Sequence, residues 1–126
     1  MISIPFDERL DTAILNRVYA GNAQYAEHIF AHYLEGIDQY LTQITVSMKN
    51  CDYKQGAITS HLLVNWMNGV GLTELQPILK TMEEQFQQGK KEDLPQSLAA
   101  LTAAEKEKRP IVEAQHIRLQ ELLSMR

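Results

Sequence analysis

The apolar positions of this chain recur mainly in steps of three and four residues, the spacing that places side chains on one face of an α-helix. The longest such stretch predicts a helix from about Asn22 to Met48. Its apolar stripe consists of Ala26, Phe30, Tyr33, Ile37, Tyr40, Ile44 and Met48, widened by Leu34 and Leu41. Alternating steps of four and three residues are typical of the buried seam of an antiparallel bundle.

A shorter helix is predicted on either side of this long one. The first runs from about Asp11 to Ala20, with Asp11 as its N-cap and Gly21 as its stop. The second begins after the N-cap Asp52 and ends near Asn68. A helical wheel of this second helix predicts a buried arc of Ile58, Thr59, Leu62, Leu63, Trp66, Met67 and Val70.

Two further helices complete the pattern. Thr73 and Gln76 are spaced as a capping box and predict the start of the next helix. The last segment begins at the N-cap Asp93, with Pro95 in its first turn, and Pro110 is predicted to kink or restart it. The inward stripes are Leu75, Leu79, Met82 and Phe86, then Leu94, Leu98 and Leu101, and, beyond the proline, Ile111, Val112, Leu119, Leu122 and Leu123. The stripe beyond the proline can fold back on the bundle or pair with another chain.

Together these elements predict an all-α fold. We expect an antiparallel, up-down-up-down four-helix bundle with an extra short N-terminal helix and a helical C-terminal extension. The length of 126 residues suits one domain, so residues 1–126 are assigned to a single unit. The bundle covers about residues 8–108 and the extension about residues 110–126.

Composition and charge narrow the class of protein. The hydrophobic fraction of 44% with 22% charged residues is that of a soluble globular chain, and no window approaches the roughly 20 apolar residues that span a bilayer. The N-terminus lacks a secretory signal and Cys51 is the single cysteine, so we expect a cytoplasmic protein. A net charge of -4 argues against nucleic-acid binding, and no membrane partner is expected.

His61 is the one candidate for a reactive side chain. On the helical wheel it lies opposite the apolar arc, so its imidazole is predicted to face solvent from a rigid helix. Its neighbours on that outward arc, one and two turns away, are Lys54, Ala57, Val64, Asn65 and Asn68.

The positions of His61, Leu63, Gly71, Leu72 and Leu75 resemble the motif of histidine phosphotransfer (HPt) domains, which act in bacterial and fungal phosphorelays. The family pattern is a histidine followed by an apolar residue, a lysine and a glycine, then a second glycine that opens the next helix. The family carries no ATP-dependent kinase activity of its own.

The resemblance covers about residues 8–105 and implies that His61 accepts a phosphoryl group from the aspartyl-phosphate of a receiver domain and relays it to another receiver. The implied partners are a response-regulator receiver domain, a hybrid sensor histidine kinase, or both. No cofactor and no metal is implied for this chain. Glu83 falls where family members carry the residue that hydrogen-bonds the imidazole, and it is expected to orient the ring.

The residues expected to contact the partner are Ala57, Val64, Asn65 and Asn68. Two of them depart from the family pattern, because Val64 and Asn65 stand where the family has its lysine and glycine. We therefore expect Lys54 or Lys80 to offset the charge of the phosphoryl group in place of that lysine.

Other interpretations remain beside this one. The alternative function is a catalytically degenerate HPt-like module that binds a receiver, or that dimerises through the apolar stripe beyond Pro110, although we expect a monomer. A histidine-kinase dimerisation domain would need an ATP-binding domain, whose motifs this chain lacks. His28, His32 and Glu35 have a metal-like spacing that a solvated helix face explains equally well, and His116 has no partner that the sequence identifies.

Overall fold

The computed structural model describes residues 3–125 and is all-helical, which confirms the predicted fold class. Within these residues there is no strand. The elements are α1 (Thr12–Tyr19), α2 (Ala23–Lys49), α3 (Tyr53–Gly69), the 3-10 helix η1 (Thr73–Leu75), α4 (Gln76–Gln87) and α5 (Leu94–Ser124).

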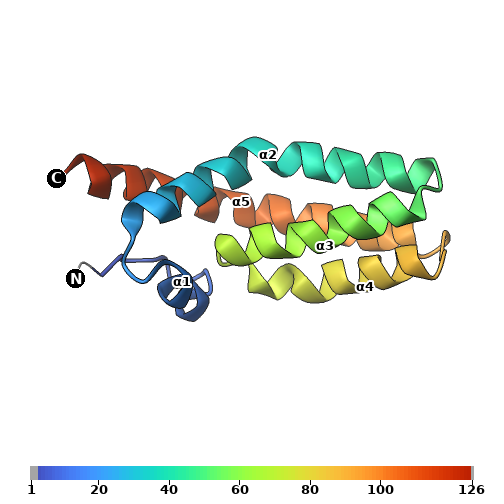
Figure 1. Cartoon of the computed structure of the whole chain (residues 1–126), viewed down its shortest axis with the longest axis horizontal. Coiled ribbons are helices and arrows are strands. Elements are labelled where there is room, and N and C mark those ends of the chain that lie inside the picture. Colours follow the sequence, from blue (N-terminus) through green and yellow to red (C-terminus); the bar gives the residue numbers. More distant parts are fainter. Residues whose placement is uncertain (1–2, 126) are drawn as a thin grey trace.

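The four longer helices lie side by side around a common core. Helix α2 packs against α3 and α5, and α4 packs against the same two helices. Figure 1 shows α2 and α4 running toward one end of the molecule and α3 and α5 returning from it. The short helix α1 lies at the end where α3 finishes and contacts both α2 and α3.

The long stripe predicted for α2 does form its buried face. Ala26, Phe30, Tyr33, Ile37 and Ile44 are buried. Further along the helix Leu41 is also buried, whereas Leu34, Tyr40 and Met48 pack against the core with part of their surface still exposed.

The buried arc of α3 differs from the prediction, because Ile58 and Leu62 are 44% and 45% exposed. The side of α3 that faces the core instead includes Gly56 and Ser60, both of which are buried. A Cβ on Gly56 would come within 2.2 Å of the Phe86 ring, so the missing side chain lets α4 approach closely on that side. The helix is rotated toward its small residues, and this rotation leaves two branched apolar side chains in solvent.

Two predicted N-caps, Asp11 and Asp52, are confirmed, whereas Asp93 precedes α5 without a side-chain capping hydrogen bond and the predicted capping box is wrong. The side chains of Asp11, Asn22 and Asp52 each accept a backbone N–H in the first turn of the following helix. Thr73 begins η1, and its hydroxyl donates to Asp11 Oδ2 at 2.8 Å, while the Gln76 amide donates to the side chain of a residue on α3. Tertiary partners therefore outcompete the local cap.

Gly71 fixes the turn between α3 and η1. Its φ of 78° lies in the left-handed region that favours glycine, and a Cβ there would lie 2.9 Å from Leu10 Cβ and Leu15 Cδ1. Only a glycine fits both the backbone conformation and the space.

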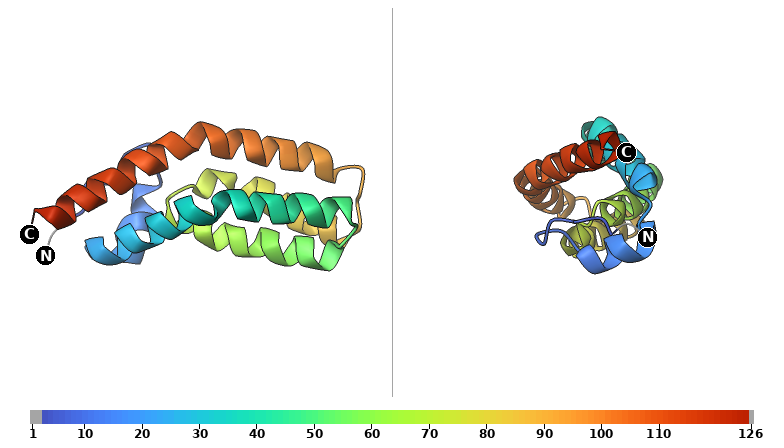
Figure 2. Two further views of the ribbon diagram at one scale, coloured as in Figure 1. Left: turned by 90° about the horizontal axis from the view of Figure 1, so that it is seen from above. Right: turned by 90° about the vertical axis from the view of Figure 1, so that its left-hand side faces the viewer.

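Of the two outcomes predicted for Pro110, a kink or a restart of the last helix, the restart is wrong. Helix α5 continues through Pro110, and Figure 2 shows it bending in its middle, where the ribbon changes from orange to red. Ile111, Val112 and Leu119 are buried within this chain. Because their burial fixes the second half of α5, the single backbone hydrogen bond lost at the proline does not break the helix.

Among the residues that the structure describes, no helix is long and apolar enough to cross a membrane.

Candidate functional site

His61 and Glu83 meet on the rim between α3 and α4. His61 Nδ1 lies 3.3 Å from Glu83 Oε1, and the two side chains are 66% and 24% exposed. The structure thus brings together the candidate nucleophile and the residue that the resemblance assigned to orient it.

The packing of each helix explains why these two side chains meet. On α3 the core is formed by Leu63 and Met67, so His61 stands outside it. On α4 the core is formed by Met82 and Phe86, and Glu83 follows directly at the edge of that stripe. Each residue therefore sits at the solvent border of the α3–α4 contact.

A carboxylate beside one ring nitrogen has a defined chemical effect. When Nδ1 carries the proton and its N–H donates a hydrogen bond to Glu83 Oε1, Nε2 is left with a free lone pair. The His61 side chain is largely exposed, so this nitrogen is accessible to a group presented by a partner. Glu84, next in sequence, is exposed, and the two adjacent glutamates project in different directions from α4.

The two candidate cations are not fixed in place. Lys54 on α3 and Lys80 on α4 are exposed, and within residues 3–125 neither makes an ion pair or a side-chain hydrogen bond. Each is a solvated ammonium that must move to reach a group on His61. Among residues 3–125, no hydrogen bond connects either lysine to the imidazole.

The four expected partner-contact residues are not equivalent. Asn65 is exposed, whereas Ala57, Val64 and Asn68 are half-buried. The side-chain oxygen of Asn68 accepts a hydrogen bond from the amide of Gln76 at the start of α4. Asn68 is thus already engaged within the chain, and Asn65 offers the freer polar group.

The surface beside His61 is more apolar than the helical wheel predicted. The exposed Ile58 and Leu62 lie on the same outward side of α3. A shallow cavity of about 280 Å³ opens at the end of this helix, with Val18, Tyr19, Tyr25, Ile29, Asn65, Trp66, Asn68 and Gly69 as its lining. The sequence signal for this surface was the pair of small residues, Gly56 and Ser60, that sets the rotation of α3.

Helix α1 holds this end of α3 by polar contacts to its last turn. The Tyr19 hydroxyl donates to the Gly69 carbonyl at 2.5 Å, and the Asp11 N–H donates to the Gly71 carbonyl at 2.9 Å. Burial raises the pKa of Tyr19 above its ordinary value, so its hydroxyl remains protonated as a donor. The cavity at the end of α3 therefore has a fixed wall.

The other histidines belong to different surroundings. The rings of His28 and His32 lie edge to face with centroids 4.4 Å apart, and residues 3–125 contain no cluster of three or more side chains that could hold a metal ion. His116 Nε2 lies 2.8 Å from Glu27 Oε2, which joins α5 to α2. This is the partner that the sequence did not identify.

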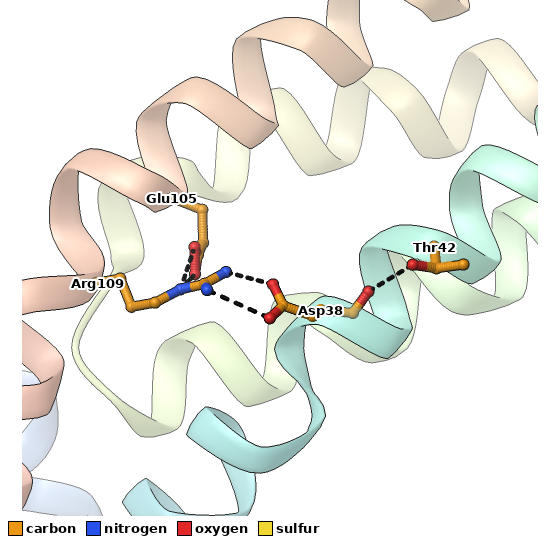
Figure 3. A network of polar contacts seen from close by, with 4 residues as sticks. All are labelled: Asp38, Thr42, Glu105 and Arg109. Carbon is orange, nitrogen blue, oxygen red and sulfur yellow. Dashed lines mark hydrogen bonds and ion pairs between the residues drawn. The ribbon is translucent and has the colours of Figure 1, made fainter.

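A charged cluster that the sequence did not predict, with the buried Glu105 at its centre, lies on the opposite pair of helices (Figure 3). The side chain of Glu105 is completely buried and accepts from Arg109 Nε at 2.6 Å, and Arg109 Nη2 donates to Asp38 Oδ1 at 2.8 Å. The hydrogen bond to Glu105 raises the pKa of Arg109. Burial and the nearby Glu105 charge raise the pKa of Tyr33. The cluster connects α5 to α2 and is not part of the histidine site.

Comparisons with known proteins give no family for this chain, because no model of a protein family, no curated protein and no solved structure matches it.

Proposed function

We propose that this protein is a histidine-containing phosphotransfer protein, in which His61 accepts a phosphoryl group from an aspartyl-phosphate of a receiver domain and passes it to another receiver. The observation that carries the proposal is the exposed imidazole of His61 with its Nδ1 3.3 Å from the Glu83 carboxylate. The order and direction of the helices also suit the antiparallel, up-down-up-down four-helix bundle of that family.

The proposed transfer step uses the free nitrogen of the ring. The Nε2 lone pair attacks phosphorus, a new N–P bond forms, and the P–O bond to the receiver aspartate breaks and leaves a carboxylate. The proton stays on Nδ1, where Glu83 accepts its hydrogen bond, and the ring becomes a phosphoimidazolium. Glu83 both orients the ring and offsets the positive charge that develops on it.

The remaining site residues have supporting roles in this proposal. Lys54 and Lys80 offset phosphoryl charge from solvated positions. Ala57, Val64 and Asn65, together with Asn68, contact the partner. The partner is a response-regulator receiver domain or the receiver of a hybrid sensor histidine kinase, and it supplies the metal ion of its own acidic pocket.

The direct test is phosphotransfer from labelled receiver domains of the source organism. The wild-type protein is expected to acquire a base-stable, acid-labile phosphoramidate, and His61→Gln to acquire none. His28→Gln is the matched control, because His28 is also exposed on a helix. Label that survives in His61→Gln would move the site, and absence of label with every receiver would contradict the proposal.

A second candidate is an interaction module that binds a receiver without chemistry. The exposed Ile58 and Leu62 and the apolar cavity at the C-terminal end of α3 favour it. Calorimetry with unphosphorylated receivers separates the two functions, since this candidate predicts binding without transfer of label.

A further inference from the structure

A second cavity, of about 420 Å³, is lined by residues from the middle of α2 and by Trp66 of α3. We infer that this cavity binds a guanidinium group, with the indole of Trp66 as the stacking surface and the carboxylate of Glu35 as the counter-charge. The site does not use His61, which is not among the residues that line it.

Gly36 provides the room for a ligand. His32, Gly36 and Tyr40 follow one another at intervals of four residues, so they lie in a row along one side of α2. The ring centroids of His32 and Tyr40 lie 6.2 Å and 6.5 Å from that of Trp66. A Cβ on Gly36 would meet the Tyr40 ring at 3.5 Å, an ordinary contact distance, and a longer side chain there would extend into the cavity. The missing side chain therefore leaves a recess with aromatic walls.

The charges of the lining favour a cation over an anion. The face of an indole or phenol ring attracts a cation, and the attraction is strongest at tryptophan. Glu35 adds a full negative charge, and within residues 3–125 its carboxylate makes no ion pair. In the part of the chain that the structure describes, the lining contains no lysine or arginine.

The hydrogen-bond acceptors of the lining select a guanidinium among cations. A guanidinium is planar, stacks on an aromatic face and carries N–H donors around its edge. The Glu35 carboxylate and the side-chain amide oxygens of Gln39 and Gln43 are acceptors on the same cavity. A quaternary ammonium has no N–H and would leave them unused. The guanidinium can belong to a free small molecule or to an arginine side chain of another protein.

The test uses the single tryptophan of the chain as a reporter. The isotope-labelled full chain gives one indole N–H signal in NMR spectra, which is followed during titration with methylguanidinium, N-acetylarginine amide and tetramethylammonium at constant ionic strength. Methylguanidinium is expected to shift the signal with a Kd of roughly 1–10 mM, and tetramethylammonium to bind about threefold more weakly or less. Equal binding of N-acetylarginine amide assigns the site to an arginine side chain, and binding of methylguanidinium alone assigns it to a free small ligand.

Two variants test the two parts of the site. Gly36→Leu fills the recess and is expected to weaken binding of methylguanidinium by about tenfold or more, because its side chain occupies the space of the ligand. Its melting temperature should not fall, since leucine favours a helix more than glycine does. Glu35→Gln is expected to weaken binding by about fivefold, the upper range for one exposed ion pair. Glu84→Gln, which removes the same charge from α4 outside the lining, is the matched control and should bind as wild type does.

Four results would overturn the inference. Trp66 also lines the cavity at the end of α3, so an unchanged Kd in Gly36→Leu would place the probe there. Equal losses in Glu35→Gln and Glu84→Gln would reduce the effect to net charge. Tetramethylammonium that binds as tightly as methylguanidinium would remove the role of the acceptors. If no probe shifts the indole signal, the site does not bind a guanidinium, and the proposed role of His61 is unaffected.

Discussion

At the scale of single residues, the candidate site depends on one contact between two helices. The Glu83 carboxylate reaches His61 Nδ1, while Glu84 beside it is exposed to solvent. Adjacent residues on a helix thus have different roles because one lies at the edge of the buried stripe and the other does not.

Glu83→Ala is expected to slow phosphotransfer to His61 by roughly ten- to hundredfold, the usual range for loss of a group that orients a histidine. The melting temperature should stay nearly unchanged, because an exposed pair adds little stability. Transfer rates by quenched flow and a thermal melt check both expectations, with Glu84→Ala as the control. A large drop in melting temperature would instead give Glu83 a structural role.

Gly71 supports the site indirectly, because it turns the chain from α3 to η1. Gly71→Ala is expected to lower the free energy of unfolding by about 3 kcal/mol, since the backbone is left-handed and the new Cβ would press on Leu10 and Leu15. Gly89→Ala is the matched control. Its φ is 65°, but the nearest atom to a Cβ there is 3.9 Å away, so about 1 kcal/mol is expected. If urea denaturation shows that Gly71→Ala and Gly89→Ala lose the same free energy of unfolding, backbone strain alone explains the loss.

At the scale of whole helices, the polar cluster between α2 and α5 fixes how these two helices pack. Glu105 has no solvent exposure, and Arg109 satisfies it while reaching Asp38 on the other helix (Figure 3). A buried carboxylate without this partner is costly.

Arg109→Met is therefore expected to lower the free energy of unfolding by about 3 kcal/mol. The double substitution Glu105→Leu with Arg109→Met should recover most of that loss, because no buried charge then remains. Lys106→Met, at an exposed neighbouring position, should be nearly neutral. If the double variant is as unstable as Arg109→Met, lost packing and not an unpaired buried charge explains the loss of stability.

The existence of each helix followed from the spacing of apolar residues, but the rotation of α3 did not. A helical wheel weights Ile58 and Leu62 by their hydrophobicity, whereas the packed structure buries Gly56 and Ser60 because small side chains let α4 approach. Pro110 failed as a helix boundary for a similar reason, since burial of the residues after it outweighs one lost hydrogen bond.

At the scale of the whole molecule, the N-terminal segment is connected to the last helix. The Asp7 N–H donates to Gln115 Oε1 at 2.7 Å, and the Asp7 carboxylate pairs with Arg9 at 2.8 Å. The hydrogen bonds from Arg9 lower the pKa of Asp7 to about 2. The hydrogen bond from Asp7 to Gln115 thus connects the N-terminal segment to the second half of α5.

This shift in pKa predicts a dependence of stability on pH. Because the folded state favours ionised Asp7, its contribution is present above pH 3.8 and is lost as pH falls toward about 2. The effect should be about 1 kcal/mol or less, since Arg9 is exposed. Urea denaturation from pH 5 to pH 2 should show wild type and Asp7→Asn converging at the acid end. If the free energies of unfolding of wild type and Asp7→Asn differ by the same amount at every pH, the contribution of Asp7 comes from packing.

The apolar stripe beyond Pro110 also acquires its role only in the whole molecule. Ile111, Val112 and Leu119 are buried within this chain. A dimer through that stripe stays a prediction, and light scattering of the full chain measures it.

The sequence by itself determined the all-α class, the helix positions, the N-caps Asp11 and Asp52 and the outward position of His61, because these depend on local spacing and local hydrogen bonds. The resemblance that it carried assigned Glu83. The tertiary structure decided the 3.3 Å contact between His61 and Glu83, the exposure of Ile58 and Leu62, the partners of Thr73 and the buried Glu105 cluster. These features depend on how closely two helices approach and which side each turns to the other, and a periodic pattern contains neither quantity.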